Sequence, residues 1–197
     1  MLRVFVALIS AVIPAKAAFH LFDIQEIYSN SDGSVQFVEL FTTTDSQQFV
    51  SGHTLRLEQI SPLATLDTFT FPTNGPSPTS NKTYLIGTST LDSLYGLTPD
   101  FILPANFLNV TGGFSNKRLN FAESTDIVNL GLLPLDGVKS LDGIVSNASA
   151  SVSAVNEQAT PTNHAGQTVV IPEPGSVGLV TIGALALGCA IFGRRRR

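Results

Sequence analysis

The chain has 197 residues, of which 43% are hydrophobic and 13% are charged, and its formal net charge is −4. The basic residues gather at the two ends, so the stretch 18–171 holds five basic and 14 acidic side chains, a formal charge of −9. An acidic surface repels phosphate backbones, which argues against nucleic acid as a partner, and the single Cys189 excludes an intrachain disulfide.

The first residues show the three parts of an export signal. A basic residue precedes the apolar run 4–13, and Ala15-Lys16-Ala17 then resembles an A-x-A cleavage site with Ala18 as the first mature residue. The alternatives are a buried helix or a retained anchor, but ten apolar residues span only about 15 Å as a helix, half of a ~30 Å hydrocarbon core. We therefore predict a signal peptide over residues 1–17, removed by signal peptidase.

Short apolar runs separated by turn signals occupy residues 18–145, which is long enough for one domain with a core of its own. The turn sequence Asn30-Ser31-Asp32-Gly33 predicts a β-hairpin between the first two runs. Leu91 to Leu94 predict one helical turn. The many short strands favour an all-β sandwich. The predicted strands are 22–28, 35–41, 54–60, 69–71, 83–87, 127–132 and 143–145.

Several of these segments together resemble a lamin tail domain. The opening of that family is similar to I-Q-E-I-Y at 24–28, F-V-E-L at 37–40 and S-G-H-T-L at 51–55. Its end is similar to D-I-V-N-L at 126–130, followed by the turn 136–137 and by L-D-G-I at 141–144. The resemblance implies an immunoglobulin-like β-sandwich without enzymatic activity, of a kind found on many bacterial surface and secreted proteins.

Within the interval 146–171 that follows the domain, residues 146–167 are rich in Ser, Ala, Asn and Thr, with few large apolar side chains. This composition predicts a flexible linker that lifts the domain away from a membrane.

The last 26 residues, 172–197, contain an uncharged run from Gly175 to Gly193 that ends in Arg194, Arg195, Arg196 and Arg197. Nineteen residues span about 28 Å as a helix, which reaches across a bilayer, and the four arginines act as a stop-transfer signal. The alternatives are a buried core helix, which does not usually end in four arginines, and a glycolipid-anchor signal, whose tail ends apolar. We predict a transmembrane helix over 175–193, with the domain outside the cytoplasm.

Pro172-Glu173-Pro174, the apolar run and the arginines together resemble the PEP-CTERM sorting signal of Gram-negative bacteria. The resemblance implies processing by an exosortase, a membrane-embedded cysteine transpeptidase that cuts near the motif. It also implies release or transfer of the protein to the cell surface or extracellular matrix. Pro172, Glu173 and Pro174 are then recognition residues, kept extended by the two prolines.

Glu26 and Glu39 are the carboxylates to consider for catalysis. Strand alternation predicts that Glu26 shares a face with Ile24 and Tyr28, and Glu39 a face with Phe37. A carboxylate among apolar side chains has a raised pKa, which suits a general acid. The alternative is a structural role, in which each carboxylate lies near a strand end or accepts backbone N–H groups. The lamin-tail resemblance includes both glutamates without catalysis and favours this alternative.

No other motif for chemistry is found. His20, His53 and His164 are scattered without zinc-ligand spacing, and there is no G-x-S-x-G sequence. The Asp-Gly pairs at 32–33, 136–137 and 142–143 are first of all turn signals and match no calcium loop. We therefore predict no metal site, no cofactor and no catalytic residue.

The sequence thus favours an exported, non-catalytic cell-surface or matrix protein that contacts polysaccharide or another protein. Two alternatives stay open. One is a small secreted hydrolase that uses Glu26 or Glu39, and the other is a membrane-anchored module that binds a soluble ligand.

Overall fold

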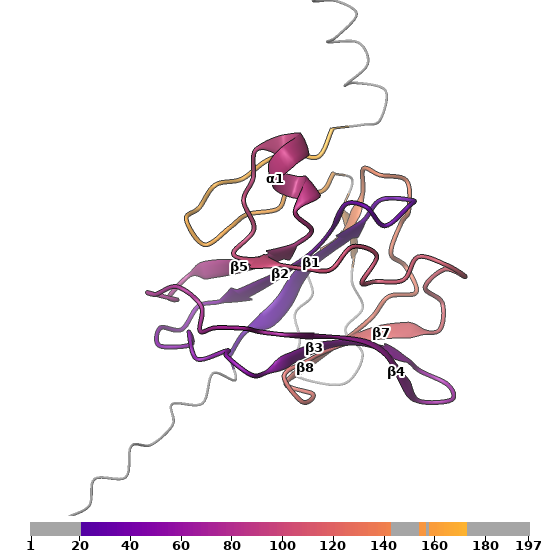
Figure 1. Ribbon diagram of the computed structural model, residues 1–197, viewed down its shortest axis with the longest axis horizontal. Coiled ribbons are helices and arrows are strands. Elements are labelled where there is room, and N and C mark those ends of the chain that lie inside the picture. The colour runs from indigo at the N-terminus through magenta and orange to yellow at the C-terminus, as the bar shows by residue number, and fades with distance from the viewer. Residues whose placement is uncertain (1–20, 143–153, 157, 173–197) are drawn as a thin grey trace, which may run out of the picture.

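The computed structural model describes residues 21–142, 154–156 and 158–172 (Figure 1). Several predictions lie outside these residues: the leader 1–17 with Ala15, Ala17 and Ala18, His20, and the strand at 143–145. The same holds for Glu173 and Pro174, the span 175–193, and Arg194 to Arg197. Among the described residues, no helix is long and apolar enough to span a bilayer.

The described residues form two β-sheets and almost no helix, which confirms the all-β prediction. One sheet has six strands in the order β10-β9-β1-β2-β5-β6, and the other has four in the order β4-β3-β7-β8. The elements are β1 (Asp23–Ser29), β2 (Gln36–Thr42), β3 (Thr54–Gln59), β4 (Ala64–Thr70), β5 (Lys82–Gly87), α1 (Thr90–Tyr95), β6 (Phe101–Ile102), β7 (Lys117–Phe121), β8 (Asp126–Asn129), β9 (Ser140–Asp142) and β10 (Ala154–Asn156).

The predicted hairpin and helical turn are both present. Strands β1 and β2 pair antiparallel, and the turn between them closes with a 3.0 Å hydrogen bond from the Asn30 N–H to the Val35 carbonyl. Gly33 takes a φ of 72°, a left-handed conformation that glycine adopts without strain. The helix α1 covers the predicted turn at 91–94.

Strand β7 was not predicted from the sequence, and β4 begins five residues before its predicted start at 69. Strand β7 begins with Lys117 and Arg118, and Asn120 separates its two buried apolar residues, Leu119 and Phe121. Most of β4 is exposed, so neither strand contains a consecutive apolar run. Their pairing with β3 defines them instead.

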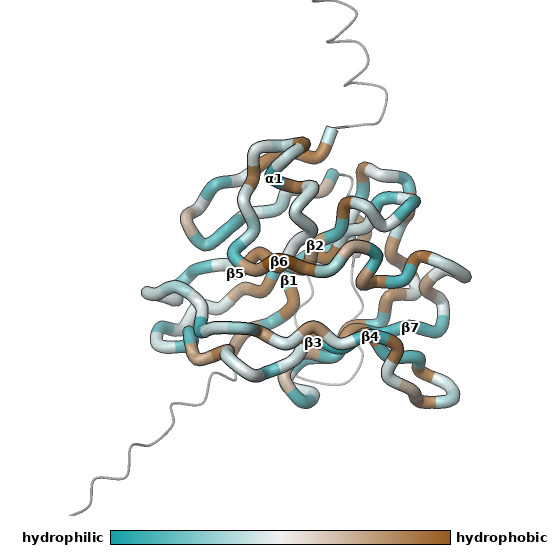
Figure 2. The backbone as a smooth tube through the Cα atoms, viewed as in Figure 1, coloured by the Kyte–Doolittle hydropathy of each residue, from teal (hydrophilic) through white to brown (hydrophobic). Residues whose placement is uncertain are grey.

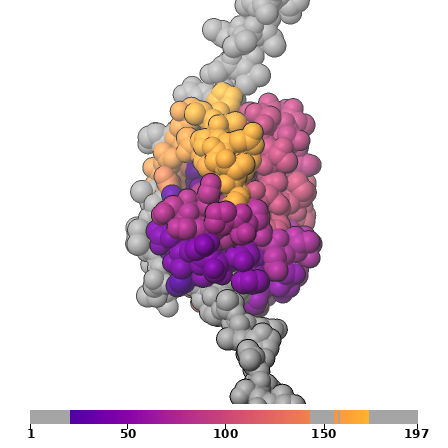
Figure 3. Space-filling model, turned by 90° about the vertical axis from the view of Figure 1, so that its left-hand side faces the viewer, coloured from indigo at the N-terminus to yellow at the C-terminus, as the bar shows by residue number. Residues whose placement is uncertain are grey.

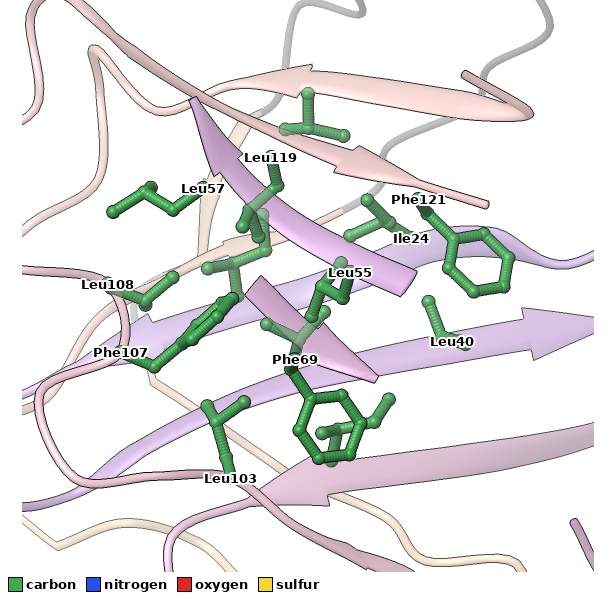
Figure 4. Packing of buried hydrophobic residues seen from close by; sticks show 14 of the residues in the cluster. Ile24, Leu40, Leu55, Leu57, Phe69, Leu103, Phe107, Leu108, Leu119 and Phe121 are labelled. Atoms are coloured by element: carbon green, nitrogen blue, oxygen red, sulfur yellow. The ribbon is translucent and has the colours of Figure 1, made fainter. Parts of the chain in front are cut away.

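The main core lies between the two sheets (Figure 4). Leu55 and Leu57 of β3 point from the four-stranded sheet toward Ile24 and Leu40 of the six-stranded sheet, and all four are fully buried. Each such side chain stabilises the fold by roughly 1.5–3 kcal/mol. Apolar and polar residues alternate along β3, as expected for a strand with one face in the core (Figure 2).

A second apolar cluster covers the other face of the six-stranded sheet. Tyr28, Phe37 and Leu85 pack there against α1 and against residues 158–172, which we call the strap. Ala159 and Ile171, near the two ends of the strap, are fully buried in this cluster. The strap lies on the surface of the domain beside earlier parts of the chain (Figure 3).

The predicted linker 146–171 is therefore wrong over residues 154–156 and 158–171. Residues 154–156 form β10, which pairs with β9. The strap is an irregular hairpin, closed by hydrogen bonds from Asn163 N–H to the Gln167 carbonyl and from Ile171 N–H to the Ala159 carbonyl. Small polar residues suggested a linker because they bury little apolar surface. The strap is held both by hydrogen bonds to the sheet and by the buried side chains of Ala159 and Ile171.

Candidate functional site

A β-bulge in β1 decides where Glu26 points. The pairing with β2 runs from Ile24 opposite Leu40 directly to Glu26 opposite Glu39, so Gln25 is an extra residue in β1. Ile24 lies in the core between the sheets, whereas Tyr28 lies in the outer cluster on the side of the strap. The prediction that Glu26 shares a face with Ile24 is thus wrong, because a bulge shifts the alternation by one residue. Glu26 faces the strap, like Tyr28.

Glu26 and Glu39 are direct cross-strand neighbours, and they are only 4% and 5% exposed. Like charges directly opposite each other destabilise a sheet. Burial raises the pKa of Glu26 to about 7, and the negative charge of Asp142 contributes to this rise. Burial also raises the pKa of Glu39 to about 8, with smaller contributions from Glu26, Asp142 and Asp100.

The strap covers this pair and supplies its hydrogen bonds. The Thr160 N–H donates to Glu26 Oε1 at 3.0 Å, and the Thr162 N–H donates to Glu39 Oε2 at 2.6 Å. In addition, Ser140 Oγ of β9 donates to the same Glu26 Oε1 at 2.6 Å. Two buried carboxylates are therefore capped by neutral donors.

A third carboxylate continues the row. Asp100, the residue before β6, accepts the N–H groups of His164 and Leu85 through Oδ2, both at 2.9 Å. The backbone N–H groups of every second strap residue, 160, 162 and 164, thus donate to carboxylates of β1, of β2 and of the residue before β6. Alternate residues of an extended chain point to the same side, so one edge of the strap can reach all three carboxylates. The first arm of the strap crosses the strands of the sheet.

This arrangement bears directly on the two roles considered for the glutamates. A pair of carboxylates with separated, raised pKa values suits acid–base chemistry, but it needs an open site where a substrate can approach. Here the main chain of the strap occupies that approach, and it presents N–H groups to both carboxylates. The structural alternative expected carboxylates that accept backbone N–H groups, and both glutamates do so.

The other candidates are not brought together. His53 Nδ1 lies 3.1 Å from Glu123 Oε2, while His164 Nε2 lies 2.8 Å from the Pro78 carbonyl in a different part of the fold. Over residues 21–142, 154–156 and 158–172 there is no cluster of three or more side chains suited to a metal. Asp136 Oδ1 accepts the N–H groups of Val138 and Lys139, as expected for a turn aspartate.

Sequence reasoning missed Ser140, Asp100 and the strap as parts of this site. Apart from Pro172 of the Pro-Glu-Pro motif, none of these residues lies in a motif, and the hydrogen bonds join residues 64 to 134 positions apart. The one signal in the sequence was the apolar run Val169-Val170-Ile171, which a solvated linker does not require.

Compared with protein families, characterised proteins and solved structures, the chain shows no significant match.

Proposed function

We propose that this chain is an exported, non-catalytic surface or matrix protein that is sorted through its PEP-CTERM-like tail. The observation that carries the non-catalytic assignment is the closed carboxylate pair, because the chain's own strap binds both Glu26 and Glu39. Within the proposal, the two-sheet domain is an immunoglobulin-like sandwich of the lamin-tail type.

Export and sorting are supported by the sequence of the two ends. The leader 1–17 has the composition of a signal peptide, and 172–197 combine the Pro-Glu-Pro motif, an uncharged run and four arginines. Signal peptidase and an exosortase-type enzyme are the expected processing partners. The protein is first held in the membrane by 175–193 and then placed on the cell surface or outside the cell.

The domain would contact polysaccharide or another protein through an exposed region. Strand β4 is an edge strand of the four-stranded sheet, and Leu63 and Leu66 beside and within it are 67% and 40% exposed. An edge strand with exposed apolar side chains is a typical site of contact between chains.

Mass spectrometry of the mature protein from cells and medium tests the proposal. We expect the extracellular form to begin at Ala18 and to end near Pro172. The variant Glu173→Gln removes the charge of the motif and should accumulate unprocessed in the membrane fraction. Glu123→Gln, a matched change on the domain surface, should be processed normally. An extracellular form that retains Arg197 would refute sorting by cleavage.

The raised pKa values of Glu26 and Glu39 favour the hydrolase as the second candidate. A hydrolase of this kind requires the strap to leave the sheet. Purified protein should then cleave a polysaccharide or peptide, and Glu26→Gln and Glu39→Gln should each abolish the reaction while Glu123→Gln retains it. Equal activity in all three variants would remove this candidate.

A further inference from the structure

Several acidic side chains lie close together beneath the strap. Glu26 and Glu39 lie opposite each other under the strap, each at 5% exposure or less, and accept bonds from its N–H groups. Acidic groups face them from two further elements: Asp142 in β9 and Asp100 before β6. From the strap, His164 contributes its backbone N–H to Asp100, while its ring nitrogen Nε2 lies at the Pro78 carbonyl.

We propose that the strap is a pH-controlled clasp, docked on the sheet while at least one of Glu26 and Glu39 is protonated and released when both carboxylates ionise. A protonated carboxyl group still accepts an N–H through its carbonyl oxygen, and its O–H removes one charge from the pair. When the pair is neutral or carries one charge, burying it costs little free energy compared with the doubly charged pair. Doubly charged, it places like charges on opposing residues without access to water.

Two effects oppose each other when the pair ionises. An anion accepts the strap N–H groups more strongly than a neutral acid does, which favours docking. Burial and the neighbouring carboxylates favour release. For Glu39, burial outweighs the hydrogen bond from Thr162, and the pKa is raised to about 8. For Glu26, burial likewise outweighs the bonds from Ser140 and Thr160. Release of the strap would return both carboxylates to water, so a rise in pH favours the open form.

The position of the strap gives this device a consequence for sorting, which rests on the proposed function. The strap ends at Pro172, the first residue of the sorting motif, and Ile171 beside it is fully buried in the docked form. A processing enzyme needs an extended, accessible segment. Undocking would lengthen the accessible chain before the motif, so mildly alkaline conditions would favour cleavage and acidic conditions would oppose it.

Hydrogen–deuterium exchange of the full chain in a nonionic detergent tests the clasp. Amide protection in 158–172, corrected for the intrinsic rate at each pH, should be high at pH 6 and fall about tenfold per pH unit above pH 8 for each proton released. Amides of β3 and β7 in the other sheet serve as the internal reference and should keep their protection. Strap protection that is unchanged from pH 6 to pH 9.5 would overturn the proposal.

Glutamine variants provide the second measurement. Glu39→Gln and Glu26→Gln each keep an acceptor oxygen but prevent double ionisation, so the strap should remain protected at pH 9.5. Glu123→Gln removes one negative charge at a site away from the strap and should behave like the wild type. If one of the two glutamine variants fails to fold, the other decides. An equal loss of protection in Glu26→Gln, Glu39→Gln and the wild type would refute the clasp. Strap release in the absence of any cleavage in cells would refute the sorting proposal alone.

Discussion

Glu26 and Glu39 face each other across β1 and β2, and each binds the backbone N–H of a different residue of the strap. Two of the most buried acids of the domain thus hold its last described segment. The pair was a candidate for catalysis in the sequence, and in the fold it is an attachment point.

The stability of the protein should depend on pH through this pair. The folded pKa values of about 7 for Glu26 and about 8 for Glu39 lie above the ordinary value of 4.5. The folded state therefore binds more protons than the unfolded state, so this stabilisation is complete below about pH 4.5 and is lost as the pH rises through 7 and 8. Urea unfolding should show a loss on the order of a few kcal/mol between pH 5 and pH 9.

The double variant Glu26→Gln, Glu39→Gln is the control for that measurement. It carries neither titrating group, so its unfolding free energy should change much less over the same range. An identical pH profile for the variant and the wild type would show that other groups cause the dependence.

Ile171 tests whether the strap belongs to the folded domain. Its side chain is fully buried in the outer cluster, so Ile171→Ala should lower the free energy of unfolding by about 2–4 kcal/mol. Its neighbour Val170 is 52% exposed, and Val170→Ala should change stability by no more than about 0.5 kcal/mol. Thermal unfolding of both variants measures these changes. Equally small losses of stability in the two variants would indicate that the strap contributes nothing to the stability of the fold.

Gly75 is required by the close approach of Tyr84. A Cβ atom at position 75 would clash with the ring of Tyr84, whose hydroxyl donates to the Pro76 carbonyl at 2.6 Å. Gly75→Ala should therefore destabilise the protein by about 1–3 kcal/mol. At Gly131 the nearest atom to an added Cβ is 3.9 Å away, so Gly131→Ala should be tolerated. Denaturant midpoints of the two alanine variants test the contrast.

Glu58 is the ionic centre of the four-stranded sheet. It is 5% exposed, its Oε2 accepts from Arg118 at 2.8 Å, and its Oε1 accepts from Asn120 at 3.1 Å. Glu58→Ala would leave these donors without their acceptor and should cost about 2–4 kcal/mol. Glu123→Ala breaks the exposed contact with His53 and should cost less than about 1 kcal/mol. Chemical denaturation at pH 7 measures both, and similar losses would contradict the assignment of Glu58 as the more important acid.

The sequence alone predicted the all-β class, the first hairpin and the helical turn. These features depend on local chemistry: the apolar residues of 35–41, the turn residues 30–33, and Leu91 and Leu94 at a spacing of three residues. Such signals act within a few residues of chain, so they can be read without the fold.

Only the tertiary structure decided which face of the sheet Glu26 lies on and whether the strap belongs to the folded domain. One extra residue, Gln25, reverses the alternation of β1, and only its pairing with β2 reveals the bulge. The composition of the strap is that of a linker, and the strap itself contains no sign of its anchors. These are Glu26, Glu39 and Asp100, which are distant in sequence. Hydrogen bonds between such distant groups leave no local pattern, so only the folded chain shows that residues 158–172 are part of the domain.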